Sequence, residues 1–433
     1  MAHDRMTHQF IQRLVAIALS MALAACSSSG YLKNPQESLM AVVDAGSRSS
    51  RIYLYKTAPD GAFVKITQLF TSKDVPHELS WYNGSRGADS APDNAGTSGI
   101  QPLLSALAAY LDSSGIARNQ VSVSLLATAG MRMVDARTAD TIYQSVKTTI
   151  ANNGFPVRKV DTLSGQKEGI YAWADVNYML NNFKTKNTTK GIVEIGGASS
   201  QVAFVESSMS NGSNLNVTNI EINGMHYPVF SVSYLGLGLN QARQVMINDK
   251  TSGGVDASVC YPNNSMALPI TYDANVNNIR INAAGSQFSA PICHGVFLRI
   301  ITQMTANADN NYPVTQISSL GSFKEMQFLG LSAAHGLLRD WGALHAANPQ
   351  QTLENNVAST CSGDNAWTRV LALYKNISNV FSQNGCADAT YISAYVYSPQ
   401  SLGIHPAQLS GTGSIDGSKL TWTRGYVLVE TAP

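Results

Sequence analysis

Short apolar segments alternate with segments of helical periodicity through the first half of the chain. Four segments have the length and composition of strands: Met40–Val43, Arg51–Lys56, Val121–Leu126 and Val157–Leu163. Three others space their apolar residues for one buried helical face: Gly99–Asp112, Thr138–Asn152 and Ile170–Met179. This order of strands and helices is typical of an α/β fold.

One strand-turn-strand pattern occurs twice. Val42–Tyr55 reads VVDAGSRSSRIYLY, and Ile192–Val205 reads IVEIGGASSQVAFV, with four of 14 positions identical and Asp44 matched to Glu194. Each copy is an apolar strand that ends in a carboxylate, a turn of glycine and hydroxyl residues, and a second apolar strand. Such a turn can hold a phosphate and a hydrated metal ion together. Unless the likeness is a chance similarity of two hairpins, it predicts a two-lobed protein that grips one phosphate chain from both sides.

Composition narrows the possible partners. The chain has 433 residues, enough for two domains or one large bilobal enzyme. Its net charge is +1 and only 13% of its residues are charged. A neutral chain without a basic run lacks the electrostatic footprint of a nucleic-acid-binding protein. We therefore expect no nucleic-acid partner, and local groups must hold any anionic substrate.

The amino terminus has the pattern of an export signal. Arg5 and Arg13 precede the apolar run Leu14–Ala25, which is too short to span a bilayer but suits a signal peptide. Residues 23–26 read LAAC and resemble a bacterial lipoprotein cleavage box, which would make 1–25 the signal peptide, Cys26 the lipidated first residue and 26–37 a tether. The alternative is an ordinary signal peptide with Cys26 as a bystander. We expect an outer-membrane lipoprotein, or a periplasmic or secreted protein, of a bacterium.

The cysteine count supports export. Apart from Cys26, the chain has Cys260, Cys293, Cys361 and Cys386. An even number of cysteines in an exported chain implies two disulfides, for which three pairings are possible. We predict the sequential pairs Cys260–Cys293 and Cys361–Cys386, because they close the shortest loops.

Glu168 is the candidate general base. It follows the strand Val157–Leu163 and lies in or just before the first turn of the next helix. The helix dipole and the free N–H groups there favour an ionised carboxylate, as a base that takes a proton from water requires. A capping glutamate would show the same pattern, so the sequence leaves both interpretations open.

Four segments, in order, resemble the apyrase-conserved regions of the nucleoside triphosphate diphosphohydrolases: DAGSRSSR (44–51), ATAGMR (127–132), SGQKEGIYAWADVN (164–177) and EIGGASSQ (194–201). LTWTRGY (420–426) resembles the carboxy-terminal signature of that family, and YLGLGL (234–239) a further segment of it. The resemblance implies two ribonuclease-H-like lobes of the actin and sugar-kinase superfold with a nucleotide cleft between them. Lobe I would comprise residues 38–162 and 405–433, and lobe II residues 163–404.

The resemblance also implies an activity and the residues that carry it. The expected enzyme is an exported, metal-dependent hydrolase that converts nucleoside tri- and diphosphates to monophosphates by in-line attack of water. The implied roles are catalysis by Glu168, Ser199 and Gln201; phosphate binding by Ser47, Arg48, Ser49, Ser50, Thr128, Ala129, Gly197 and Ala198; binding of Mg²⁺ or Ca²⁺ through water by Asp44 and Glu194; and base binding by Phe328 and His335. We expect a monomer.

Three positions depart from the family pattern. Glu194 stands where the family prefers Asp, Ser200 where it prefers Thr, and Arg48 where many members carry a small residue or Ser. Two other functions also fit the sequence. One is a polyphosphate or guanosine-tetraphosphate phosphatase of the same superfold, although the export signal and the WTRGY tail count against it. The other is a surface lipoprotein that binds nucleotide without turnover, although such a protein has no use for Glu168 and Gln201.

Overall fold

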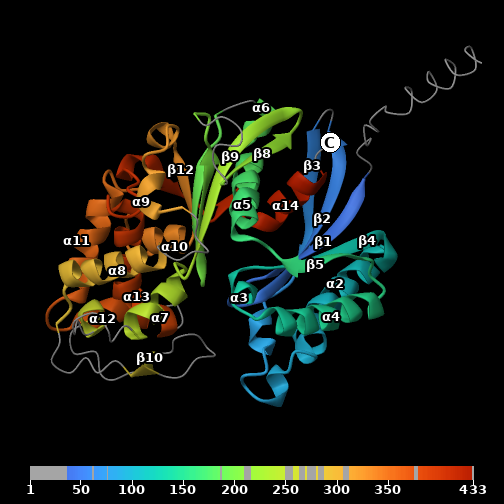
Figure 1. Ribbon diagram of the computed structural model, residues 1–433, viewed down its shortest axis with the longest axis horizontal. Helices are drawn as coiled ribbons and strands as arrows, with labels where there is room; N and C mark the ends of the chain where they lie inside the picture. Colours follow the sequence, from blue (N-terminus) through green and yellow to red (C-terminus); the bar gives the residue numbers. More distant parts are fainter. Residues whose placement is uncertain are drawn as a thin grey trace, which may run out of the picture.

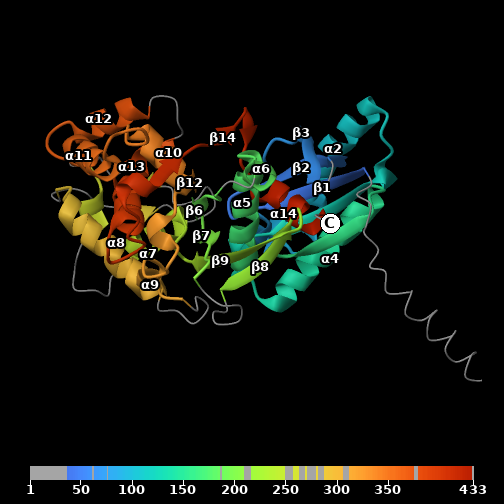
Figure 2. The same cartoon turned by 90° about the horizontal axis from the view of Figure 1, so that it is seen from above.

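Two α/β lobes lie side by side in the protein, with two helices between their sheets (Figures 1 and 2). The computed structural model describes residues 37–60, 63–75, 77–185, 188–208, 216–248, 257–262, 269–270, 279–280, 287–305, 312–374 and 379–431. The predicted signal peptide, Cys26 and the tether up to residue 36 lie outside the described residues. Within the described ranges, no helix is long and apolar enough to cross a membrane.

The first lobe is built on a five-stranded sheet. Its strand order is β3-β2-β1-β4-β5, with β1 (Ser38–Ala45), β2 (Ser50–Asp60), β3 (Phe63–Thr71), β4 (Val121–Ala127) and β5 (Val157–Thr162). Its helices are a π-helical turn η3 (Ala95–Ile100), α2 (Gln101–Ser114), α3 (Ala129–Arg132) and α4 (Ala136–Asn152), with 3-10 turns at Leu79–Tyr82, Ala88–Ser90 and Arg118–Gln120. Strands β1 to β3 are antiparallel, whereas β4 and β5 run parallel to β1.

The second lobe repeats this plan with one added edge strand. Its order is β13-β12-β6-β7-β9-β8, with β6 (Gly191–Ile195), β7 (Ser199–Val205), β8 (Val217–Ile222), β9 (Met225–Leu235), β12 (Phe328–Ser332) and β13 (Leu409–Gly411). Strands β6, β7, β9, β12 and β13 take the places of β1 to β5 in turn. The sequence predicts a return of the chain to the first lobe near residue 405, whereas β13 pairs with β12 in the second sheet. The other lobe boundaries stay a prediction.

Helices of the second lobe cover the outer face of its sheet (Figure 1). They are α7 (Leu239–Asn248), α8 (Ala290–Thr305), α9 (Val314–Ile317), α10 (Ala333–Asp340), α11 (Pro349–Cys361), α12 (Ala366–Leu373), α13 (Asn379–Ile392) and the π-helical turn η7 (Ser393–Tyr397). The short helix α6 (Asn182–Thr185) lies on the inner side of the sheet, where Phe183 packs against Trp173. Two short hairpins, β10 (Pro269–Ile270) with β11 (Ile279–Arg280) and β14 (Ser414–Ile415) with β15 (Ser418–Lys419), and 3-10 turns at Ala257–Cys260, Phe323–Glu325 and Pro406–Gln408 complete the fold.

The central layer is formed by α5 (Gly165–Met179) and α14 (Trp422–Thr431), which pack between the two sheets. Successive side chains of a strand point to opposite faces of its sheet, so each strand contributes apolar residues to the cores on both faces. Val42 faces this central layer, while its neighbours Ala41 and Val43 face the core of the outer helices. The two central helices cross closely at Gly425, where an added Cβ would lie 1.8 Å from the Tyr171 carbonyl oxygen. Only glycine fits there.

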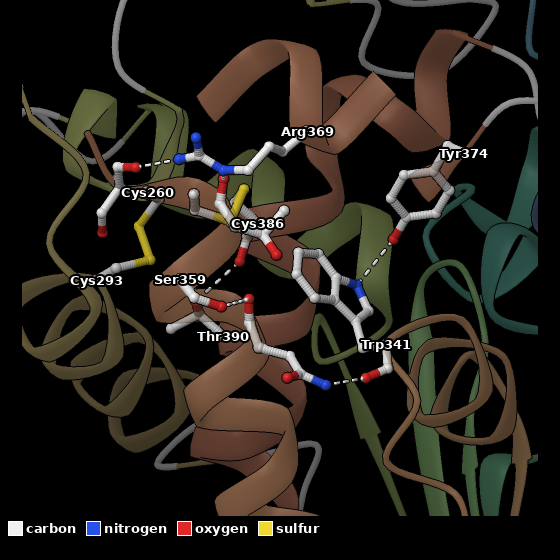
Figure 3. The surroundings of a disulfide bond; sticks show 12 residues. Cys260, Cys293, Trp341, Ser359, Arg369, Tyr374, Cys386 and Thr390 are labelled. Atoms are coloured by element: carbon white, nitrogen blue, oxygen red, sulfur yellow. Dashed lines mark hydrogen bonds between the residues drawn. A yellow bond between two sulfur atoms is a disulfide. The ribbon is translucent and has the colours of Figure 1, made fainter. Parts of the chain in front are cut away.

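Both predicted disulfides are confirmed. Cys260 pairs with Cys293 and Cys361 with Cys386, and all four cysteines are buried in the second lobe. Figure 3 shows them among its helices, near a Trp341–Tyr374 hydrogen bond of 2.9 Å. By constraining the unfolded chain, each disulfide stabilises the fold by roughly 2–4 kcal/mol.

Candidate active site

The two repeated hairpins have the same register. Asp44 pairs with Arg51 across the first hairpin, and Glu194 pairs with Gln201 across the second. Each turn is closed by one backbone hydrogen bond, from Gly46 N–H to the Ser49 carbonyl at 3.1 Å and from Gly196 N–H to the Ser199 carbonyl at 3.0 Å. The repeat found in the sequence is therefore a repeat in backbone structure.

The two turns meet tip to tip. A Cβ added to Gly197 would lie 2.7 Å from Ser47 Oγ and 3.1 Å from Arg48 Cγ, so the second turn packs directly against the first. A cavity of about 450 Å³ opens beside this contact. The ends of β1 and β4 also reach it, because Thr128 N–H donates to the Ala45 carbonyl at 3.0 Å. The cavity thus lies at the edge where the carboxyl ends of strands from both lobes converge.

The structure brings most of the predicted site residues to this cavity. Its lining includes Asp44, Ser47, Arg48, Ser49, Thr128, Ala129, Glu168, Glu194, Gly197 and Ser199. Ser50, Ala198 and Gln201 are buried and do not line it. Strand β2 begins at Ser50, and neighbouring residues of a strand point to opposite faces, so Ser50 turns away from the side chain of Ser49.

Glu168 is held by one of its two carboxylate oxygens. Arg132 pairs with Oε2, and Gln201 Nε2 donates to the same oxygen at 3.2 Å. No described group makes a hydrogen bond to Oε1, and Glu168 lines the cavity. Burial raises the pKa of Glu168, while the charge of Arg132 and its hydrogen bond act in the opposite direction. The guanidinium therefore favours the ionised form that a base needs.

The position of Glu168 in α5 bears on the capping interpretation. Ser164 is the N-cap, and its hydroxyl accepts the Lys167 N–H at 3.3 Å. Among the described residues, the Glu168 carboxylate bonds to the side chains of Arg132 and Gln201 and to no backbone N–H group. The cap is thus made by another residue, and the carboxylate is directed toward the cavity.

Gln201 links the two catalytic candidates. Its Nε2 lies 2.7 Å from Ser199 Oγ, 3.0 Å from Ser233 Oγ and 3.2 Å from Glu168 Oε2, so its two hydrogens are shared among three acceptors. With only 1% of its surface exposed, Gln201 contacts the cavity through these partners.

Asp44 and Glu194 both line the cavity, and each carboxylate has unmet hydrogen-bonding capacity. Asp44 Oδ1 and Glu194 Oε2 are buried and have no partner among the described residues. Burial, followed by the charge of Glu168, raises the pKa of Asp44 to about 7 and that of Glu194 to about 8. The described residues contain no group of three or more metal-binding side chains. Two orphaned carboxylate oxygens therefore fit a hard cation that takes its other ligands from water.

The two base-binding candidates lie elsewhere. Phe328 is fully buried on β12 and packs against Phe204 and Phe323, so the structure places it in the core of the second lobe. His335 lines a smaller neighbouring cavity of about 210 Å³. Glu194 and residues 419–422 line both cavities.

Several lining residues were not expected from the sequence. Tyr53 and Asp74 come from the first lobe, Asn240 and Ser332 from the second, and Lys419–Trp422 from the segment between the end of β15 and the start of α14. Arg132, which pairs with Glu168, stands at the end of the ATAGMR motif. Its place in that motif is the signal that could have identified it, whereas no local pattern marks Asp74 or Lys419.

The fold and the cavity define a two-lobed α/β enzyme of the actin and sugar-kinase-like class. The chain belongs to the GDA1/CD39 (nucleoside phosphatase) family, whose model matches residues 31–432. The predicted family, fold class and hydrolase class are thereby confirmed. Members of this family depend on a divalent cation.

Relatives of known name cover different parts of the chain. A guanosine-diphosphatase of Schizosaccharomyces pombe is 30% identical over 51% of this chain and 40% of its own length. Human ectonucleoside triphosphate diphosphohydrolase 3 is 22% identical over 89% of this chain and 77% of its own. The crystal structure of a Neospora caninum nucleoside triphosphate hydrolase matches 98% of this chain and 97% of its own with a TM-score of 0.60 at 16% identity. That structural likeness shows the shared fold.

Proposed function

We propose that this protein is an exported hydrolase that removes terminal phosphate from nucleoside tri- and diphosphates and ends at the monophosphate. The observation that carries the proposal is Glu168, which has one oxygen fixed by Arg132 and Gln201 and lines the cavity beside two phosphate-binding turns. This arrangement suits a base that acts on a water molecule in front of a bound phosphate.

In the proposed step, a water oxygen attacks the terminal phosphorus in line with the leaving oxygen. Glu168 Oε1 accepts a proton of that water as the new P–O bond forms. The bond to the bridging oxygen breaks, and the electron pair leaves with the shortened nucleotide. Ser199 Oγ accepts a hydrogen bond from Gln201, so its own proton is available to orient the water. Gln201 acts through Glu168 and Ser199 as a positioning residue.

The residues at the tips of the two turns would bind the phosphates. Ser47, Arg48 and Ser49 in the first turn and Thr128 at the end of β4 line the cavity with hydroxyl and guanidinium donors. Gly197 leaves the second turn without a side chain at the same place. A diphosphate would bind in the same site after shifting by one phosphate, which would allow stepwise conversion to the monophosphate.

Asp44 and Glu194 would hold the divalent ion, Mg²⁺ or Ca²⁺, through water. Bound there, the ion would neutralise charge on the phosphate oxygens. The longer side chain of Glu194 reaches Ser332, whose Oγ donates to its Oε1 at 3.0 Å. That hydrogen bond fixes one oxygen and leaves Oε2 for the ion or its water.

Export is supported by the two buried disulfides, which form in oxidising compartments, and by relatives whose names mark them as ectoenzymes. We propose that Cys26 carries a lipid anchor. A Cys26→Ser variant should then leave the membrane fraction and appear in the soluble exported fraction, whereas unchanged fractionation would contradict lipidation.

The test of the function is phosphate release by purified residues 27–433. The substrates are ATP, ADP, GTP, GDP and polyphosphate, each with Mg²⁺, with Ca²⁺ and with chelator. We expect metal-dependent release from tri- and diphosphates, with the monophosphate as the end product. Release from polyphosphate alone would identify the other phosphatase class, and nucleotide binding without release would identify a binding protein.

A further inference from the structure

The start of the carboxy-terminal family signature, together with Lys419 directly before it, reaches the cavity. Residues 419–422, here called the strap, line both the main cavity and its smaller neighbour. The strap begins at the last residue of the hairpin β14–β15, in which Ile415 pairs with Ser418. Asp416 and Gly417 form the two-residue loop with φ values of +49° and +75°. Asp-Gly is a preferred pair for this left-handed turn, so the local sequence itself builds the hairpin that ends at Lys419.

A buried ion pair fixes the backbone of the strap. Arg424 Nη1 lies 3.0 Å from Asp175 Oδ1, and both side chains are almost fully buried. Asp175 Oδ2 also accepts the Thr421 N–H at 2.7 Å, and Arg424 Nη2 donates to the Lys419 carbonyl at 3.3 Å. The backbone is therefore held on both sides of Leu420, and the side chain of Lys419 starts from a fixed point at the cavity rim.

Lys419 differs from the other cations that line the cavity. Arg51 is paired with Asp74 and donates to Tyr53 Oη at 3.1 Å, and Arg48 lies against Gly197. The Lys419 ammonium has no ion pair or hydrogen bond within the described part of the chain. Partial burial, followed by repulsion from Arg51, lowers its pKa, and Asp74 and Asp44 act in the opposite direction. Two cations thus stand close together at the cavity, and of the two only Arg51 has a direct ion pair within the described residues.

We propose that Lys419 binds the phosphate chain of the substrate from the rim of the cavity. An ammonium group with three donors, none of which bonds to a described residue, is suited to anionic oxygens. A phosphate chain between the strap and the first turn would relieve the repulsion between Lys419 and Arg51. This assignment rests on the proposed function and adds a substrate contact from the carboxy-terminal segment.

The test compares three variants of the exported chain. Lys419→Gln removes the charge, Lys419→Arg retains it, and Lys65→Gln removes an exposed charge on β3, away from the cavity. The probe is a non-hydrolysable methylene-bridged nucleoside diphosphate with Mg²⁺, titrated by calorimetry. We expect Lys419→Gln to raise Kd about tenfold, equivalent to about 1.4 kcal/mol, with Lys419→Arg within about threefold of wild type and Lys65→Gln unchanged.

Salt dependence and catalysis provide further readouts. Because Lys419 is exposed, the loss of affinity should shrink between about 0.03 M and 0.5 M salt, as the Debye length shortens. KM should rise by the same factor as Kd while kcat stays within about twofold, since a contact present before and during the reaction affects binding alone.

An unchanged Kd in Lys419→Gln, or an equal loss in Lys65→Gln, would overturn the assignment while leaving the hydrolase intact. If the wild-type protein neither binds the analogue nor releases phosphate, the proposed function itself fails, which is a separate result. Unfolding temperatures of all variants within about 2 °C of wild type would show that the changes act on binding.

Discussion

The turn between β1 and β2 and the turn between β6 and β7 share their register and closing hydrogen bond, yet their paired residues have different surroundings. Arg51, opposite Asp44, is partly exposed and pairs with Asp74 at the cavity rim. Gln201, opposite Glu194, is buried and bonds to Glu168 and Ser199. One backbone plan therefore supports two kinds of chemistry, because the neighbours of each hairpin differ. In the account proposed here, the first turn binds phosphate and the second positions water.

Giving the second hairpin the arginine of the first, at position 201, should disrupt this division between phosphate binding and water positioning most strongly. Gln201→Arg would place a second buried guanidinium beside Arg132 and remove the amide that holds Ser199 to Glu168. We expect kcat to fall by about 100-fold, since small displacements of reacting groups cost that much. The unfolding temperature should also fall, because an unpaired charge would be buried. Steady-state kinetics and thermal unfolding measure both effects, and near-normal turnover would contradict the role of Gln201.

The carboxylates Asp44 and Glu194 should link metal binding to pH. Their pKa values of about 7 and 8 lie above the values near 4 expected in the unfolded chain. The folded protein therefore retains protons that the unfolded chain releases. This contribution to stability is complete below about pH 4, is lost progressively as the pH rises from about 4, and is gone once the pH has passed about 8. Without divalent ions, the unfolding temperature should fall across that window.

Mg²⁺ should reverse this loss by replacing the protons. At 100 times its Kd, a ligand of the folded state stabilises by about 2.7 kcal/mol. We expect the stabilisation by Mg²⁺ to grow from about pH 6 to pH 8 in wild type and to be largely absent in Asp44→Asn and Glu194→Gln. Glu221→Gln, an exposed change, is the control. A pH-independent effect of Mg²⁺ would contradict this assignment.

Contact between the turns can be tested at Gly197. A methyl group there would press on Ser47 and Arg48 and move the phosphate-binding turn away from the second turn. We expect Gly197→Ala to lower kcat/KM about tenfold, which corresponds to about 1.4 kcal/mol. Gly295→Ala in α8, where an added Cβ meets no atom, should leave activity unchanged. Equal kinetics for both variants would show that the contact does not matter.

The smallest effect should come from a substitution of Arg51, which lies opposite Asp44 in the first hairpin. Arg51 lies at the rim in an ion pair with Asp74, and exposed pairs contribute little to stability. Arg51→Gln should raise KM about threefold with little change in kcat or unfolding temperature. A loss of turnover as large as that of Gln201→Arg would mean that the two hairpins contribute alike to the chemistry.

Local pattern predicted the strands, the main helices of the first lobe, the duplicated hairpin and the disulfide pairs, because these depend on periodicity and short-range turns. Local pattern predicted less well which side chains of the turns face the cavity. Ser49 and Ser50 are adjacent, but one lines the cavity and the other is buried, which depends on where β2 begins. Phe328 fitted an aromatic base contact in sequence, yet its strand lies between β13 and β6 in the second sheet and the ring is buried.

The residues that were missed reach the site through tertiary structure. Arg132 meets Glu168 because α3 and the start of α5 both follow strands that end at the same edge of the first sheet. Lys419 reaches the cavity because α14 crosses between the lobes and Asp175 anchors the segment before it. A short stretch of sequence cannot show either contact, because the residues involved lie far apart in the chain.

The central claim is that Glu168 activates water while other groups bind the nucleotide, and Glu168→Gln tests it most directly. This change removes the base but preserves the shape and the hydrogen-bonding capacity toward Arg132. The measurement pairs single-turnover phosphate release with the Kd of a non-hydrolysable analogue. We predict release to slow by roughly 10²–10⁴-fold while Kd stays within about threefold and the protein remains folded. Release at the wild-type rate by a folded Glu168→Gln protein would contradict the account.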